Sequence, residues 1–175
     1  AIDVLSQDPD GFFLMVEGSQ VDWAGHNNDA IYMVTDFIAF DDAVKVAKDF
    51  ADGAGSNETV VIAFPDHNTG ALALGTDYSD VPYTATKLDH MVGPLKDMTM
   101  TSGGVASMMT TDTVAEVQSV ISNYWGLNIT TNEAQEILDL EDSGAMSMNY
   151  AIAHVINQSG YLTLGWTTHG HSAED

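Results

Sequence analysis

The chain has 175 residues, of which 45% are hydrophobic, and this is enough for a globular domain with a sizeable core. Its 26 acidic and 4 basic side chains give a formal net charge of -22, so we expect neither nucleic acid nor anionic membrane as a partner. Cysteine is absent, which excludes disulfides and thiolate metal sites, and no apolar run approaches the roughly 18 residues of a membrane span.

The excess of acidic residues has two explanations. It adapts the protein to high salt, where counterions screen the repulsion between carboxylates, or it gathers cations at the surface. We favour salt adaptation, because cation binding does not account for so few lysines. An anionic substrate would be repelled by this surface at long range, so a phosphate site would need metal ions to reverse the local field.

The first part of the chain predicts a strand, a helix and a second strand. Residues 12–16 form a short apolar run that is typical of a buried strand, and the polar segment 18–28 is expected to be a loop. Residues 35–52 have helical spacing, with a possible N-cap at Thr35 or Asp36 and a stop at Gly53. Residues 59–64 (TVVIAF) resemble a second buried strand. This order favours a parallel sheet.

The rest of the chain is expected to be mostly loops and helices until a final strand. The expected elements are a short strand at 71–75, loops over 76–111 with a short helix near 105–109, helices at 113–125, 131–140 and 146–158, and a strand at 161–166. The fold class is therefore α/β, a largely parallel sheet flanked by helices with a helical and loop insertion. We divide the chain into a core portion (1–75), an insertion (76–145) and a return to the core (146–175).

Candidate metal ligands gather after three of the predicted strands. Because the carboxyl ends of parallel strands meet at one edge of a sheet, these clusters are expected to converge. Carboxylates and imidazoles without cysteine suit Zn²⁺ or Mg²⁺. The clusters are Glu17, Asp22 and His26, then Asp66 and His67, and finally His169 and His171. The two other histidines are predicted to have no ligand role: His90 in an exposed loop, and His154 within a helix.

Three segments, VEGSQVDWAGHNND, FPDHNTG and GWTTHGHSAED, resemble the three metal-binding segments of bacterial alkaline phosphatases in their order and internal spacing. The resemblance implies two Zn²⁺ ions and one Mg²⁺ ion. It also implies a role for each matching residue: Glu17 as a Mg²⁺ ligand, Asp22, His26 and His171 at the first zinc, Asp66 and His67 at the second zinc, and Trp23 close to the substrate. His169 is a possible alternative ligand to His171, and we favour His171.

The resemblance further implies a phosphoserine intermediate, but the residues that would form it are not found here. The nucleophilic serine and the phosphate-binding arginine of the family lie outside this chain, which contains no arginine. We therefore expect the chain to be partial, with no catalytic residue of its own, and inactive alone. A longer chain, or a second one, would supply the N-terminal half.

The expected function is that of part of a metal-dependent phosphate monoester hydrolase. By resemblance it would be a periplasmic or secreted homodimer, although no signal peptide is visible in this chain. The insertion would be either a lid-like crown over the site or a surface subdomain. Two alternatives stay open: a phosphodiesterase or phosphomutase of the same superfamily, and a non-catalytic metal-binding fragment.

Overall fold

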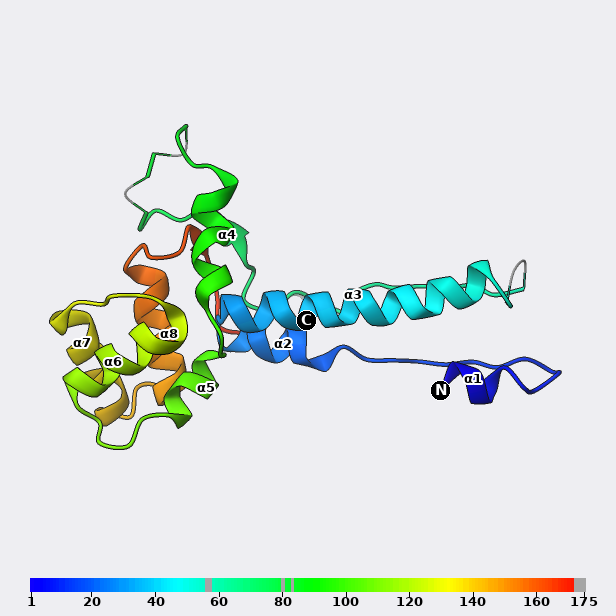
Figure 1. Cartoon of the computed structure of the whole chain (residues 1–175), viewed down its shortest axis with the longest axis horizontal. Coiled ribbons are helices and arrows are strands. Elements are labelled where there is room, and N and C mark those ends of the chain that lie inside the picture. Colours follow the sequence, from blue (N-terminus) through cyan, green and yellow to red (C-terminus); the bar gives the residue numbers. More distant parts are fainter. Residues whose placement is uncertain (56–57, 80, 83, 172–175) are drawn as a thin grey trace.

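An elongated arm and a cluster of helices make up the structure, a computed structural model that describes residues 1–55, 58–79, 81–82 and 84–171 (Figure 1). The tail of the third resembling segment, 172–175, lies outside the described residues. The elements in chain order are α1 (Ile2–Leu5), α2 (Ser19–His26), α3 (Ala30–Asp52), β1 (Ala73–Leu74), α4 (Leu88–Asp97), α5 (Ser102–Ser107), α6 (Val114–Trp125), α7 (Thr131–Asp142), α8 (Met148–Gln158) and β2 (Leu164–Gly165).

The arm is built on α3, which extends away from the cluster formed by α4 to α8 and has α2 beside it (Figure 1). The helix predicted for 35–52 is confirmed, together with its stop at Gly53, but it begins earlier. Its N-cap is Asp29, whose carboxylate accepts a hydrogen bond from the backbone N–H of Tyr32 at 3.0 Å. Neither Thr35 nor Asp36 caps the helix, because the chain is already helical at these positions.

The predicted strands at 12–16 and 59–64 do not form within the described residues. Both segments have apolar side chains in water: Phe13 is 88% exposed and Ile62 is 74% exposed. Residues 12–18 run beside α3, with the Phe12 and Phe50 ring centroids 6.0 Å apart. A strand requires a hydrogen-bonded neighbour, and an apolar run does not by itself provide one.

The sheet formed by the described residues has two short strands instead of the expected parallel set. β1 pairs with β2 in antiparallel register, Ala73 opposite Gly165 and Leu74 opposite Leu164. The strands predicted at 71–75 and 161–166 are thus confirmed in shorter form. An isolated bridge between Thr69 and His171 continues the pairing. The pair therefore brings 66–70 next to 167–171, although α4 to α8 lie between them in sequence.

The helical cluster contains the hydrophobic core. The helices predicted at 113–125, 131–140 and 146–158 are confirmed as α6, α7 and α8, and Thr113 and Thr130 cap the first two of these through their hydroxyls. α8 packs against both α5 and α7. The buried side chains follow helical periodicity and include Val117, Ile121, Ile137, Ile152 and Ile156. None of the described helices has the length and apolar character needed to cross a bilayer.

Helix α4 lies where loops were expected. Its sequence contains Gly93 and Pro94, two residues that normally break a helix, and this conceals the pattern. The predicted exposed histidine, His90, is half-buried in the first turn of α4 and accepts a hydrogen bond from the backbone N–H of Lys87 at 3.1 Å. His154 lies in α8, as expected, and contacts the side chain of Gln158 at 2.9 Å.

One carboxylate of the cluster makes stability depend on pH. The hydroxyl of Thr110, together with the backbone and hydroxyl of Thr111, lowers the pKa of Glu116 from 4.5 to about 2. Because the folded-state pKa is depressed, the stabilisation is complete above about pH 4.5 and is lost as the pH falls towards about 2.

We expect Glu116→Gln to lower the Tm relative to wild type at pH 6, and this difference to shrink as the pH falls towards 2. Thermal unfolding of both proteins across this range measures it. Subtracting the Tm of Glu116→Gln from that of wild type at each pH removes the effect of protonating the other acidic side chains, because both proteins share it. Glu136→Gln, which removes an exposed carboxylate of α7, is the matched control. A Tm difference between wild type and Glu116→Gln that stays constant with pH would contradict the assignment.

Candidate metal centre

Helix α2 places two of the candidate ligands, Asp22 and His26, on one face. Residues 18–28 were expected to be a loop, and this was wrong, because 19–26 are helical. Asp22 and His26 are four residues apart, so their side chains lie one turn apart on the same face, with His26 Nε2 3.6 Å from Asp22 Oδ2. This spacing was the available sequence signal for a helix, and Gly18 and Gly25 obscured it.

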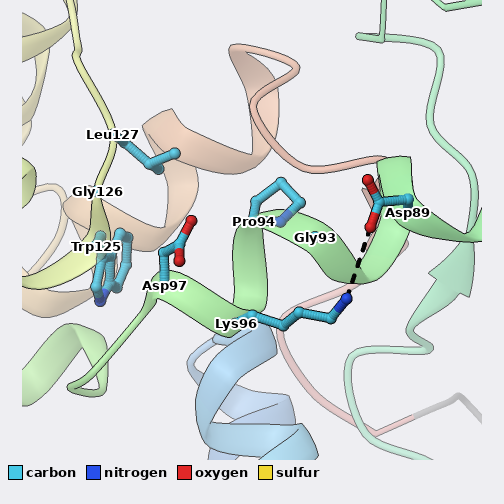
Figure 2. Close-up of a pocket in the computed structure, with 8 residues that line it drawn as sticks. All are labelled: Asp89, Gly93, Pro94, Lys96, Asp97, Trp125, Gly126 and Leu127. Carbon is cyan, nitrogen blue, oxygen red and sulfur yellow. Dashed lines mark ion pairs between the residues drawn. The ribbon is translucent and has the colours of Figure 1, made fainter.

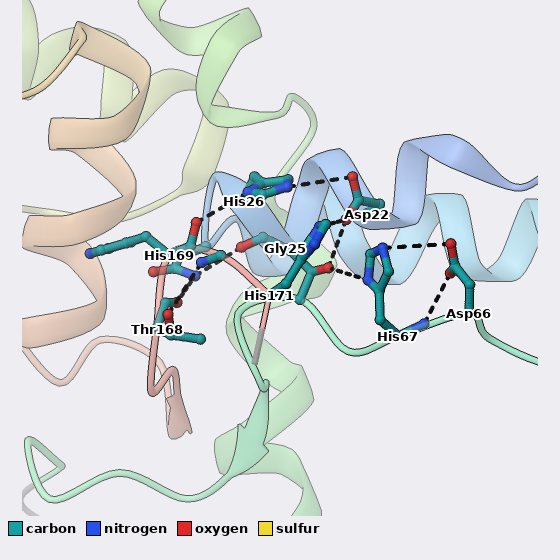
Figure 3. Close-up of polar contacts among 11 residues, drawn as sticks. Asp22, Gly25, His26, Asp66, His67, Thr168, His169 and His171 are labelled. Carbon is teal, nitrogen blue, oxygen red and sulfur yellow. Dashed lines mark hydrogen bonds and ion pairs between the residues drawn. The ribbon is translucent and has the colours of Figure 1, made fainter. Parts of the chain in front are cut away.

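His171 completes a triad with these two residues (Figure 3). Its Nε2 lies 3.3 Å from Asp22 Oδ1, and one ligand atom from each of Asp22, His26 and His171 lies within 4.8 Å of the others. One carboxylate and two imidazoles with partly exposed positions match the donor set of a zinc site that keeps a coordination position open. The donors present therefore fit a zinc ion, and the individual roles remain predictions.

His169 points elsewhere, although it lies in the same loop. Its ring centroid is 4.8 Å from that of Tyr150 and 6.3 Å from that of His154, both on α8. Burial, aided by the nearby His154, lowers the pKa of the His169 imidazole. The histidine that this loop places beside Asp22 is thus His171, which is the one favoured from the sequence.

The backbone of His169 nevertheless contributes to the centre. Its carbonyl oxygen lies 3.1 Å from His26 Nδ1 (Figure 3). A carbonyl oxygen only accepts hydrogen bonds, so in its neutral form the His26 imidazole carries its proton on Nδ1. The lone pair is then on Nε2, the nitrogen that faces Asp22. This is the arrangement by which outer hydrogen bonds orient histidine ligands in metal sites.

The second predicted pair lies beside the triad. The ring centroids of His67 and His171 are 3.7 Å apart. His67 Nε2 lies 3.5 Å from Asp66 Oδ2, and the His67 backbone N–H donates to Asp66 Oδ1 at 3.1 Å. The Asp66 side chain is 87% exposed. Glu17 and Trp23 are exposed and lie outside the triad, Glu17 just before α2 and Trp23 on it.

Two residues that the sequence analysis did not single out hold these segments together. The Thr69 hydroxyl donates to Asp22 Oδ1 at 2.6 Å and lies 3.2 Å from His67 Nδ1. The Asn28 amide donates to the carbonyls of Gly25 and Thr168, each at 2.9 Å. A Cβ atom on Gly25 would lie 2.6 Å from the Thr69 carbonyl oxygen, so the close approach of α2 to this loop requires glycine.

The electrostatics of Asp22 reflect these contacts. Burial by itself raises the pKa of this carboxyl. The hydrogen bond from Thr69, the charge of His26 and the hydrogen bond from His171 together outweigh burial, so that the pKa is lowered. The carboxylate is therefore ionised at neutral pH, as a metal ligand must be.

A hollow in the described residues lies apart from this centre. It has a volume of about 490 Å³ and lies beside α4 and the turn after α6 (Figure 2). An ion pair between Lys96 and Asp89, 3.6 Å apart, lies at its edge. None of the predicted ligands lines it, so the candidate site is the metal centre on α2.

Comparison with known proteins relates the whole chain to one family. The family model for alkaline phosphatase matches residues 1–175. Alkaline phosphatase 3 of Bacillus subtilis (strain 168) is 35% identical over 185 residues, which cover 100% of this chain and 36% of that protein. The repressible alkaline phosphatase of Saccharomyces cerevisiae is 31% identical over 182 residues, covering 97% of this chain and 31% of that protein. The chain thus spans about a third of the length of these relatives.

Two solved structures have similar folds. The cold-active alkaline phosphatase from a psychrophilic Shewanella sp. matches with a TM-score of 0.75 and 28% identity, over 98% of this chain and 39% of that one. Thermus thermophilus alkaline phosphatase matches with a TM-score of 0.82 over 99% of this chain and 38% of that one; at 20% identity, this likeness concerns the fold alone.

Proposed function

Because the chain belongs to the alkaline phosphatase family, we propose that the protein hydrolyses phosphate monoesters with metal ions held at the centre on α2. The observation that carries this proposal is the convergence of Asp22, His26 and His171 from two distant segments. Alkaline phosphatases generally depend on metal ions, and this donor set fits zinc. As the chain spans about a third of its relatives, the activity is proposed for the whole protein.

The proposed ligand assignment follows the resemblance and the geometry. Asp22, His26 and His171 would hold the first zinc ion. Asp66 and His67 would take part in holding a second, and Glu17 would take part in holding Mg²⁺. When bound, such ions neutralise a phosphoryl group and stabilise the attacking and leaving oxygens of the transfer. The serine that forms a phosphoserine intermediate, and the arginine that binds phosphate, are proposed to lie outside this chain.

The excess of negative charge supports the proposal that metal ions are needed to bind an anionic substrate. Lys45, Lys48 and Lys96 form ion pairs with aspartates on their own helices. With 26 acidic side chains and no arginine, the described chain offers little positive charge to an anionic substrate. Bound cations would reverse this field locally. The same proposal includes adaptation to high salt, a homodimeric state and a periplasmic or secreted location. Residues 76–145 would form either a lid-like crown over the site or a surface subdomain.

We expect the full-length protein to hydrolyse an aryl phosphate much faster than a bis-aryl phosphate. Treatment with a chelator should abolish the activity, and Zn²⁺ with Mg²⁺ should restore it. Steady-state turnover of the two substrates measures the preference. The 175-residue chain assayed alone is the control, and is expected to give no turnover.

Two other outcomes would replace the proposal. A strong preference for the diester would favour a phosphodiesterase of the same superfamily. Zinc binding by the full-length protein without turnover of either substrate would favour a non-catalytic metal-binding role.

A further inference from the structure

Thr69 lies where three segments of the metal centre meet. It is 7% exposed. Its backbone pairs with that of His171 through an isolated antiparallel bridge, and its carbonyl packs closely against Gly25 of α2. Its hydroxyl lies between Asp22, a predicted ligand of the first zinc, and His67, a predicted ligand of the second. One side chain therefore touches both predicted zinc sites.

The hydrogen-bonding capacity of each group decides the direction of these contacts. At neutral pH an aspartate carboxylate only accepts, so the Thr69 hydroxyl must donate its proton to Asp22 Oδ1, 2.6 Å away. A hydroxyl has one proton, so towards His67 Nδ1, 3.2 Å away, it can only accept. The neutral His67 imidazole therefore carries its proton on Nδ1 and its lone pair on Nε2, the nitrogen that lies 3.5 Å from Asp66 Oδ2.

Protonation of His67 on Nδ1 opposes the intrinsic preference of the histidine side chain. The neutral imidazole of free histidine favours the tautomer with the proton on Nε2. The contact of His67 with Thr69 and the contact of His26 with the carbonyl of His169 both call for the opposite tautomer, with the proton on Nδ1. Both imidazoles then present Nε2 to a metal ion.

We propose that Thr69 is a positioning residue that orients the Asp22 carboxylate and sets the tautomer of His67, so that both predicted zinc sites depend on one hydroxyl. The inference rests on the ligands assigned under the proposed function. It is independent of which phosphate ester is the substrate.

The first test reads the tautomer directly in metal-free, intact protein labelled with ¹⁵N in histidine. Long-range ¹H–¹⁵N correlation spectra at about pH 8.5, roughly two units above the ordinary histidine pKa, distinguish protonation at Nδ1 from protonation at Nε2. His67→Gln identifies the resonance. We expect His67 to carry its proton on Nδ1 in the wild type, and to shift towards Nε2 in Thr69→Val. A wild-type His67 protonated on Nε2 would overturn the proposal, whether or not any variant folds.

The second test measures Zn²⁺ affinity by competition with a chelator. Loss of an outer hydrogen bond to a metal ligand typically weakens binding about 10–100-fold, and we expect this of Thr69→Val. Thr69→Ser, which keeps the hydroxyl, should bind within a few-fold of wild type. Thr163→Val is the matched control, because Thr163 is also buried but donates its hydroxyl to the carbonyl of His90.

The outcomes separate this inference from the proposed function. Wild-type affinity in Thr69→Val, or equal losses in Thr69→Val and Thr163→Val, would overturn the positioning role. A wild-type protein that binds no zinc would overturn both proposals. The expected tautomer and affinities in a protein without phosphomonoesterase activity would support the positioning role and count against the proposed function alone.

Discussion

Replacing Asp22 by asparagine is expected to weaken zinc binding at the α2 centre by more than about 100-fold, because loss of a direct ligand exceeds the 10–100-fold typical of outer-shell changes. Asp22 is the anionic member of the triad and lies 3.3 Å from His171 and 3.6 Å from His26. The amide would keep the shape of the side chain but would remove the charge that balances the metal ion. Competition titration with a chelator and metal analysis after dialysis measure the loss.

Matched variants test whether the loss of zinc binding is specific to the residues of the α2 centre. Asp41→Asn removes the same charge from the exposed surface of α3 and should leave zinc binding unchanged. His171→Ala should lower zinc occupancy as Asp22→Asn does. His169→Ala should lower it far less, because the His169 ring contacts Tyr150 while its backbone carbonyl holds His26. Full zinc retention in both Asp22→Asn and His171→Ala would refute the centre.

Asp29→Ala is expected to destabilise the fold by about 2–4 kcal/mol, the sum of a lost helix cap and a buried donor left without a partner. Asp29 is 2% exposed. One carboxylate oxygen accepts from the N–H of Tyr32 and caps α3; the other accepts from the N–H of Ser102 at 2.6 Å and thereby ties α3 to α5. Denaturant unfolding monitored by circular dichroism measures the change.

The asparagine variant separates hydrogen bonding from charge. Burial raises the pKa of the Asp29 carboxyl, so the charged form is not favoured by its surroundings. Asp29→Asn keeps one acceptor oxygen but turns its NH2 group towards the other backbone N–H, so it should lose about 1–3 kcal/mol, the cost of a buried donor left without an acceptor. Asp41→Ala, on the exposed surface of the same helix, should change stability little. Equal losses in Asp29→Ala and Asp41→Ala would exclude the role assigned to Asp29.

The family and its α/β fold class could be predicted from the sequence and are confirmed by the matches over the whole chain. Local signals were sufficient where a helix has both periodic apolar residues and a cap, as in α6 with Thr113 and α7 with Thr130. They failed where breakers interrupt the pattern, as Gly25 does in α2 and Pro94 in α4. They also failed at 12–16 and 59–64, because strand formation depends on a partner that an apolar run does not specify.

The candidate site could be predicted in part for a similar reason. Residue types pointed to three clusters of candidate ligands, and the family resemblance implied the grouping of Asp22, His26 and His171, which the structure brings together. The contributions of Thr69 and Asn28 depend on which distant loop lies within hydrogen-bonding distance of them. Nothing in the local sequence of either residue contains that information. It follows from the pairing of β1 with β2 together with the close approach of Gly25 on α2 to Thr69.

The β1–β2 pair also sets the order in which the centre can assemble during synthesis. His171 lies roughly 100 residues after the loop that it bridges, and closing a loop of that length has an entropic cost that the packing of the helices between its ends helps to offset. Asp22 and His26 leave the ribosome well before their third partner, His171, which follows His26 by about 145 residues. We therefore expect the helical cluster to fold before the three residues of the centre come together.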